Sequence, residues 1–205
     1  ETNERLREEN DLLDAEMKLR EAQLQIDEQN RLYDQLTCDM KEQLDLLEGL
    51  LKSDRVTGRQ RIAKICVLSA YMKRRSNLCL LAESEKKTST KELELCISES
   101  LESMRLCNLF CSFESHCSGK TAAGELILLY DVVQQIFQQL LADAGAVMIW
   151  LRAENDSLFL KLQSDGRLCT EFPAMERWSA AGGSFSVSCG PDAAWLILQK
   201  EGGKG

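Results

Sequence analysis

The chain has 205 residues and a net charge of −8, and 44% of its residues are hydrophobic but only 6% aromatic. This composition is typical of a globular protein and excludes collagen-like and disordered chains. No apolar stretch of the sequence approaches the ~20 residues that a membrane-spanning helix requires. Nucleic acid is not an expected partner, because an acidic surface repels phosphate backbones.

The nine cysteines form no Cys-x-x-Cys pair, and several stand inside apolar runs, where a thiol acts as a small core residue. We therefore expect reduced thiols and a cytoplasmic location. The chain begins at Glu1 without a signal peptide, so we expect an excised part of a longer protein. It would then be free in the cytoplasm or the cytoplasmic part of a membrane-anchored protein, and an upstream membrane sensor stays open.

Residues 1–53 repeat apolar side chains every seven positions, which predicts a signalling helix in a left-handed coiled coil. Negative charge is concentrated here, since residues 1–55 hold 16 acidic and 8 basic side chains. Gln29 and Gln43 at core positions weaken such a coil, as suits a rod that shifts during signalling, but a passive dimerisation rod needs the same residues. In both cases we expect a homodimer joined through Leu12, Leu19, Ile26, Tyr33, Met40 and Leu47.

Residues 54–108 are predicted to form a dimerisation hairpin of two helices. After an interruption at 54–58, a helix over 59–81 has an apolar face too broad for a two-stranded seam, and a second helix runs from about Thr90 to Asn108. Two such hairpins would build a dimeric four-helix bundle. We expect this interface to include Ile62, Cys66, Ile97 and Leu101.

A basic cluster, formed by Lys73, Arg74 and Arg75, lies in the first helix of this hairpin. The simpler interpretation is a solvated helix face. The alternative is a docking surface for an acidic partner.

Residues 109–205 change from helical periodicity to the alternation of strands. We expect one amphipathic helix, over 124–142, and a turn at Asn155-Asp156. The expected strands are 109–114, 146–152, 158–163, 184–188 and 194–199. One long helix on a mixed sheet gives an α/β sandwich, and the chain as a whole is then of the α+β class.

The order of coiled coil, helical hairpin and α/β domain resembles the cytoplasmic region of a bacterial sensor histidine kinase. Residues 135–146 read Gln-Ile-Phe-Gln-Gln-Leu-Leu-Ala-Asp-Ala-Gly-Ala, which is similar to the pattern Glu-Ala-Leu-Thr-Asn-Ala-Leu-Arg-His-Ala-Gly-Ala of that family's ATPase domain. Residues 162–168, Leu-Gln-Ser-Asp-Gly-Arg-Leu, are similar to its Val-x-Asp-Asp-Gly-Arg-Gly. The resemblance implies a GHKL (Bergerat) ATPase-like fold for 109–205. It also implies a response regulator or another signalling protein as a partner.

The phospho-acceptor that this resemblance requires is missing. Arg61-Ile62-Ala63-Lys64 resembles the opening of the family's acceptor run, which puts the acceptor position at Val67. Valine cannot accept a phosphoryl group, and the only histidine, His116, lies beyond both hairpin helices.

The resemblance also identifies the equivalents of the ATP site, and most of them are replaced. Gln135 stands for the family's glutamate base, Gln139 for its magnesium-binding asparagine and Ser164 for its adenine-binding aspartate. Leu168 replaces a glycine of the nucleotide lid. Only Asp165 and Gly166 are retained, either as a plain turn or as a remnant of the nucleotide site.

Two other motifs are weaker. Cys107, Cys111, His116 and Cys117 have spacings that match no zinc pattern, so buried thiols are the preferred interpretation. Residues 118–121, Ser-Gly-Lys-Thr, resemble the end of a phosphate-binding loop but fit a turn and a helix cap better.

These observations favour a dimeric signalling module that resembles a histidine kinase and lacks phosphotransfer activity, with no cofactor expected. One alternative is an active, divergent histidine kinase that uses ATP and Mg²⁺. A second alternative is a coiled-coil scaffold unrelated to phosphotransfer.

Overall fold

The computed structural model describes residues 2–52, 58–154 and 156–201. Residues 1–42 and 43–205 form two compact units. The expected linker at 54–57 and Asn155 of the expected turn lie outside the described residues. None of the helices within the described ranges has an apolar stretch long enough to cross a membrane.

The first unit consists mainly of the long helix α1, Thr2–Asp39. The heptad positions Leu12, Leu19, Ile26 and Tyr33 are between 50% and 72% exposed in the single chain. The helix does not continue unbroken through residue 53, as the heptads suggested. It ends at a turn at Met40, which is buried, and α2 follows over Lys41–Lys52.

Helix α2 contributes to the second unit. Leu47 and Leu50 pack against the hydrophobic core of that unit. Part of the apolar surface of Leu47, which is expected in the dimer seam, is therefore covered within the chain.

A five-stranded mixed sheet forms the base of the second unit, in the order β2–β4–β5–β7–β6. Its strands are β2 (Phe110–Ser118), β4 (Ala146–Glu154), β5 (Ser157–Ser164), β6 (Ser184–Cys189) and β7 (Ala194–Lys200). Strands β2 and β4 are parallel, since a crossover helix joins them, and the other pairs are antiparallel. A separate two-stranded sheet pairs β1 (Thr88–Ser89) with β3 (Lys120–Thr121).

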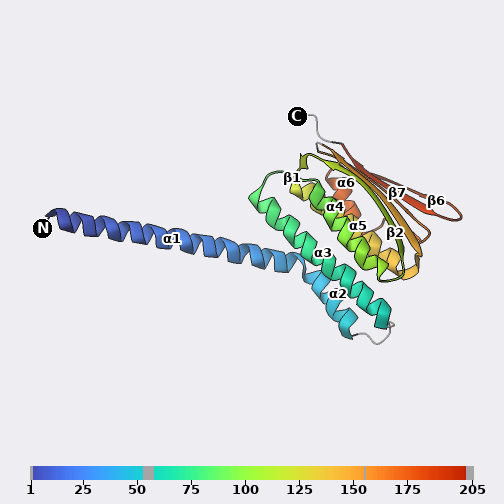
Figure 1. The fold of residues 1–205 in the computed structure, drawn as a ribbon, viewed down its shortest axis with the longest axis horizontal. Coiled ribbons are helices and arrows are strands. Elements are labelled where there is room, and N and C mark those ends of the chain that lie inside the picture. Colours follow the sequence, from blue (N-terminus) through green and yellow to red (C-terminus); the bar gives the residue numbers. More distant parts are fainter. Residues whose placement is uncertain (1, 53–57, 155, 202–205) are drawn as a thin grey trace. The chain divides into compact units, whose positions relative to one another are not determined.

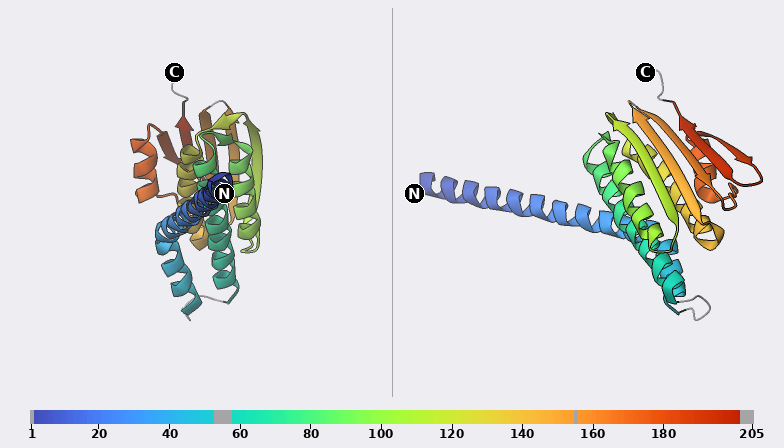
Figure 2. Two further views of the ribbon diagram at one scale, coloured as in Figure 1. Left: turned by 90° about the vertical axis from the view of Figure 1, so that its left-hand side faces the viewer. Right: turned by 45° about the vertical axis from the view of Figure 1, so that its right-hand side comes forward.

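Helices cover one face of this sheet in two layers. Helices α4 (Lys91–Arg105), α5 (Ala123–Asp143) and α6 (Pro173–Ala180) make the inner layer, and α3 (Gly58–Ser84) packs outside α4 and α5 (Figures 1 and 2). Alternation along the strands directs Val147, Ile149 and Leu151 of β4 into the core between sheet and helices. The α+β class and the sandwich of a long helix on a mixed sheet are therefore confirmed.

The hairpin expected over residues 54–108 needs a correction. Its helices correspond to α3 and α4, which do contact each other, but α4 also packs on β2 and α5. Ile97 and Leu101 are at most 1% exposed inside the chain's own core. They are therefore not available to a dimer interface. Ile62 is 62% exposed and Cys66 is half-buried, so their place in a dimer interface stays a prediction. The domain boundaries at 53/54 and 108/109 also stay predictions.

Three elements, α6, β1 and β3, were not predicted from the sequence. Helix α6 lies between the expected strands 158–163 and 184–188, although Pro173 at its first position is a favourable helix start. Strand β1 lies between the two expected hairpin helices, and β3 lies in the segment 118–121 that was expected to form a turn and a helix cap. Each of these strands has only two residues, too few to show alternation.

Candidate functional site

Two glutamines of α5, Gln135 and Gln139, contact the segment that follows β5. Gln135 and Gln139 are four positions apart and therefore share one face of the helix. The Gln139 Oε1 atom accepts a hydrogen bond from the Cys169 backbone N–H at 3.0 Å. The Gln135 Oε1 atom accepts one from the Ala174 N–H at 3.4 Å. Both amide oxygens thus hold the backbone of this segment.

The contact of Gln135 also completes the end of a helix. Ala174 is in the first turn of α6, where backbone N–H groups have no partner within the helix. A side-chain oxygen from α5 therefore takes the place of a missing cap, since Phe172 at the N-cap makes no side-chain cap bond. The glutamine acts here as a structural acceptor.

Ser164 lies at the end of β5, is only 2% exposed, and uses its hydroxyl within the fold. Its Oγ donates to the Ala146 carbonyl at 2.9 Å and accepts from the Gly166 N–H at 3.0 Å. The hydroxyl therefore uses its only hydrogen and one of its two lone pairs within the fold.

The retained pair, Asp165 and Gly166, connects the end of α5 to the end of β5. The Asp165 carboxylate accepts hydrogen bonds from the backbone N–H groups of Gly145 and Ala146, both at 2.9 Å. A Cβ atom added at Gly166 would stand 2.8 Å from the Cβ atom of Ala144. These contacts give both residues a role in a tight turn, which is the simpler of the two interpretations. Leu168, which follows, is half-buried and packs on the core.

The position expected for the phospho-acceptor is inside the protein. Val67, on α3, is 1% exposed and belongs to the hydrophobic core. A side chain there has no access to a phosphate donor in this arrangement.

A buried carboxylate, Asp131 on α5, joins three helices and was not recognised in the sequence. Its Oδ1 accepts from the Tyr71 hydroxyl at 2.7 Å and from the Arg75 Nε at 3.0 Å, both on α3. Its Oδ2 lies 3.4 Å from the guanidinium of Arg177 on α6. We call these four residues the Asp131 cluster. The available signal was a single acidic residue on the apolar side of an amphipathic helix, a position that normally requires a partner.

The charges of this cluster are stabilised by each other. Burial raises the pKa of Tyr71, and the Asp131 carboxylate raises it further, so the hydroxyl remains a hydrogen-bond donor. Burial alone would lower the pKa of Arg75, but the adjacent Asp131 raises it. The ring of Tyr71 also lies 5.3 Å from that of Tyr130, whose hydroxyl bonds Ser100 on α4 at 2.8 Å. The polar contacts thus extend from α3 to α4, α5 and α6.

The basic cluster of α3 is not one solvated face. Lys73 pairs with Glu99 of α4 at 2.8 Å, and Arg74 pairs with the same carboxylate. Arg75 is only 8% exposed and points to Asp131. Of the three residues, Lys73 alone is exposed, so docking of a partner on the whole cluster is corrected to internal pairing between helices.

The weak zinc set is not brought together. His116 and Cys117 are adjacent on β2 and therefore point to opposite faces of the sheet. His116 pairs with Glu154 at 3.2 Å. Within the described ranges, no three potential ligands lie close enough to hold a metal ion.

Comparisons with solved structures show the class of fold. A histidine kinase domain from the Erythrobacter litoralis EL346 blue-light activated histidine kinase matches 79% of this chain and 94% of its own, with a TM-score of 0.50 and 12% identity. The Acinetobacter baumannii histidine kinase AdeS matches over 81% of this chain and 98% of its own chain, with a TM-score of 0.45 and 13% sequence identity. The catalytic domain of the histidine kinase ThkA matches over 55% of this chain and 92% of its own chain, with a TM-score of 0.41 and 14% sequence identity. No protein-family model and no curated protein matches the sequence.

The chain therefore has the fold of a histidine kinase domain, with an ATPase-type α/β sandwich. At 12% identity the likeness establishes the fold alone.

Proposed function

We propose that this chain is a non-catalytic relay of the histidine kinase fold, which transmits a conformational change to a signalling partner without transferring phosphate. The observation that carries this proposal is the use of Gln135 and Gln139. Their amide oxygens hold the backbone of Ala174 and Cys169, over the helix face where the family resemblance puts the nucleotide. The proposal includes a reducing, cytoplasmic setting and no bound ATP or Mg²⁺.

Dimerisation is part of this proposal. Four heptad positions of α1 expose half or more of each apolar side chain, and a parallel coiled coil would cover them. A response regulator or another signalling protein is the proposed receiver. The Asp131 cluster supports a relay because it ties α3 to the helices that cover the sheet.

Phosphotransfer is the activity that tests the proposal. We expect no incorporation of ³²P from [γ-³²P]ATP into the chain or into a response regulator mixed with it, because Val67 is buried and has no nucleophilic atom. The quadruple variant Gln135→Glu, Gln139→Asn, Ser164→Asp and Leu168→Gly rebuilds the family's ATP-site residues, and it should still remain unlabelled. Acid-labile ³²P on the unaltered chain would establish the active, divergent kinase instead.

A further inference from the structure

The sheet of the second unit carries large apolar side chains on both faces, but in the described part of the chain the helices cover only one of them. Residues that alternate with the core residues of β4, β5 and β7 point to the other side, which we call the open face. It includes Met148, Trp150, Phe159, Trp195 and Ile197, all half-buried. A largely antiparallel sheet commonly leaves one face in solvent, where polar residues are usual, so large apolar side chains gathered there mark an interaction site.

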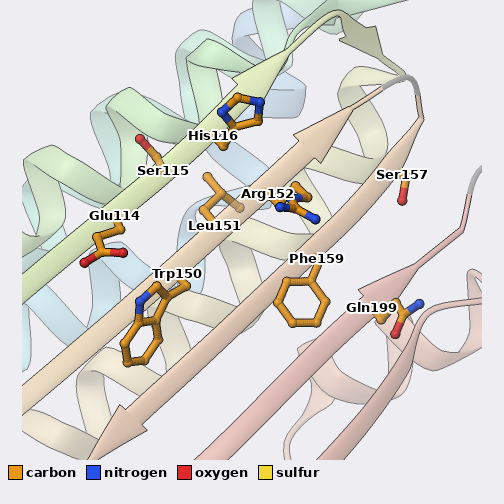
Figure 3. A pocket seen from close by; sticks show the side chains of 9 residues that line it. All are labelled: Glu114, Ser115, His116, Trp150, Leu151, Arg152, Ser157, Phe159 and Gln199. Atoms are coloured by element: carbon orange, nitrogen blue, oxygen red, sulfur yellow. The ribbon is translucent and has the colours of Figure 1, made fainter.

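The open face contains a hollow of about 590 Å³ lined by Trp150 and Phe159 (Figure 3). The two aromatic rings come from neighbouring antiparallel strands, since Trp150 is opposite Lys161 and Phe159 is opposite Arg152. Rigid aromatic side chains beside a hollow are the usual anchors of a protein interface.

Two side chains on the central strands of the open face, Arg152 of β4 and Lys161 of β5, carry positive charge. The Lys161 ammonium lies 5.1 Å from the centre of the Trp150 ring. Arg152 is exposed and makes no ion pair with any carboxylate in the described part of the chain. Two carboxylates lie at the margin of this face: Glu154, at the end of β4, is 3.2 Å from the His116 Nε2, and Glu114, on the edge strand β2, is opposite Trp150. A partner with carboxylates beside an apolar surface would complement this arrangement.

The backbone of the open face limits what can dock there. Strands β4, β5 and β7 are each hydrogen-bonded on both sides, so no further strand can be added at the centre. A nucleic-acid strand would need several neutralised phosphates, but among the described residues Arg152 and Lys161 are the two Arg or Lys side chains on this face, with Glu114 and Glu154 beside them. A helix needs no free backbone groups and packs its side chains directly on a sheet, as α5 does on the other face.

We propose that the open face is a docking site for an acidic amphipathic helix of a partner protein. Apolar side chains of that helix occupy the hollow between Trp150 and Phe159, and a carboxylate next to its apolar stripe pairs with Arg152. The site is separate from the α5 surface, so this inference does not depend on the proposed function.

The test uses the full chain and two stapled helical peptides of about 20 residues. Both carry the same Leu/Phe stripe, flanked in one by Glu and in the other by Lys. Binding is followed by NMR at the indole N–H signals of Trp150 and Trp195, with the fully buried Trp178 as internal reference. We expect the Glu peptide alone to shift the two open-face signals.

Two variants locate the contact. Arg152→Glu should lower the affinity for the Glu peptide by about tenfold or more, and it should allow the Lys peptide to bind. The matched charge reversal Lys91→Glu, on exposed α4 surface, should change neither. Phe159→Ala should weaken the Glu peptide through loss of the apolar contact.

Four outcomes would overturn the proposal. The two peptides could bind equally, which would leave an unspecific apolar patch. Neither could bind up to ~1 mM, which corresponds to only about −4 kcal/mol. Single-stranded oligouridylate could shift the Trp150 signal instead, which would assign the face to nucleic acid. The signal could also shift with protein concentration alone, which would assign the face to a second copy of the chain.

Discussion

Single residues at the ATP-site equivalents have partners inside the protein. Gln135 and Gln139 accept hydrogen bonds from the backbone that follows β5. The Ser164 hydroxyl bonds the backbone of Ala146 and Gly166, and the Asp165 carboxylate accepts from the Gly145 N–H just after α5. Gln139→Asn shortens the side chain that holds Cys169, and Ser164→Asp removes the hydroxyl that donates to Ala146, so these replacements remove contacts as well as introduce new side chains. This is why we expect the quadruple variant to be less stable than the unaltered chain.

Gly183 gives a sharper prediction at this scale. A Cβ atom there would lie 2.3 Å from the Trp178 ring, which is fully buried and donates to the Ser184 carbonyl at 3.1 Å. Gly183→Ala should lower the free energy of unfolding by about 1 to 3 kcal/mol or more, because the indole has no room to move. Urea denaturation measures this. The control Gly124→Ala has open space around it and should be neutral or slightly stabilising; equal losses in both variants would contradict the packing argument.

The buried thiols predict how stability depends on pH. Burial raises the pKa of Cys96 from 9.0 to about 12, and those of Cys111 and Cys117 to about 11. A raised pKa favours the protonated thiol in the folded state, so its stabilisation is complete below about pH 9 and is lost as the pH rises toward 11 to 12. The urea midpoint should be constant from pH 7 to 8.5 and fall above that. Cys96→Ala should make the decrease of the urea midpoint above pH 8.5 smaller. A midpoint unchanged up to pH 11 in the unaltered chain would contradict this account.

At the scale of elements, the Asp131 cluster should be the main polar connection between α3 and the helices on the sheet. Asp131→Ala leaves the Arg75 guanidinium buried without its carboxylate, and loss of one member of a buried pair costs about 3 to 5 kcal/mol. Thermal unfolding should show a large fall in Tm. The double variant Asp131→Leu, Arg75→Met should recover much of it, since no buried charge remains unpaired.

The matched control for the cluster is Glu176→Ala, an exposed carboxylate on α6. It should leave the Tm nearly unchanged. A fall in Glu176→Ala as large as in Asp131→Ala, or no recovery in the double variant, would show that the cluster does not carry this connection.

Most elements could be predicted from the sequence because their periodicity is strong. The helix over 124–142 and the strand over 158–163 differ from α5 and β5 by one residue at each end. The role of α4 could not be predicted, because an apolar stripe such as Leu93, Ile97 and Leu101 looks the same whether it packs on a second chain or on the sheet. Likewise, the sequence identifies Gln139 as a replacement, but only the fold shows that its oxygen holds Cys169.

At the scale of the whole molecule, the exposed stripe of α1 predicts a dimer. Light scattering should give at least twice the chain mass of 23.1 kDa. Leu19→Asn with Ile26→Asn removes two apolar seam residues and should yield monomer or a much weaker dimer, while the near-UV circular dichroism of the second unit stays unchanged. The control Glu16→Gln with Asp27→Asn lies off the stripe and should remain dimeric. A monomer for the unaltered chain at micromolar concentration would contradict the coiled coil.

The central claim is that this histidine kinase fold does not bind nucleotide, and calorimetric titration with Mg-ATP tests it most directly. Loss of a charge-assisted hydrogen bond alone costs about 1.5 to 3 kcal/mol, and by the family resemblance Gln139 and Leu168 stand in place of a metal ligand and a lid glycine as well. Affinity should therefore fall by a factor of hundreds or more, since each ~1.4 kcal/mol is tenfold. We predict no detectable heat of binding at ~1 mM Mg-ATP. Saturable binding with a micromolar Kd would contradict the account.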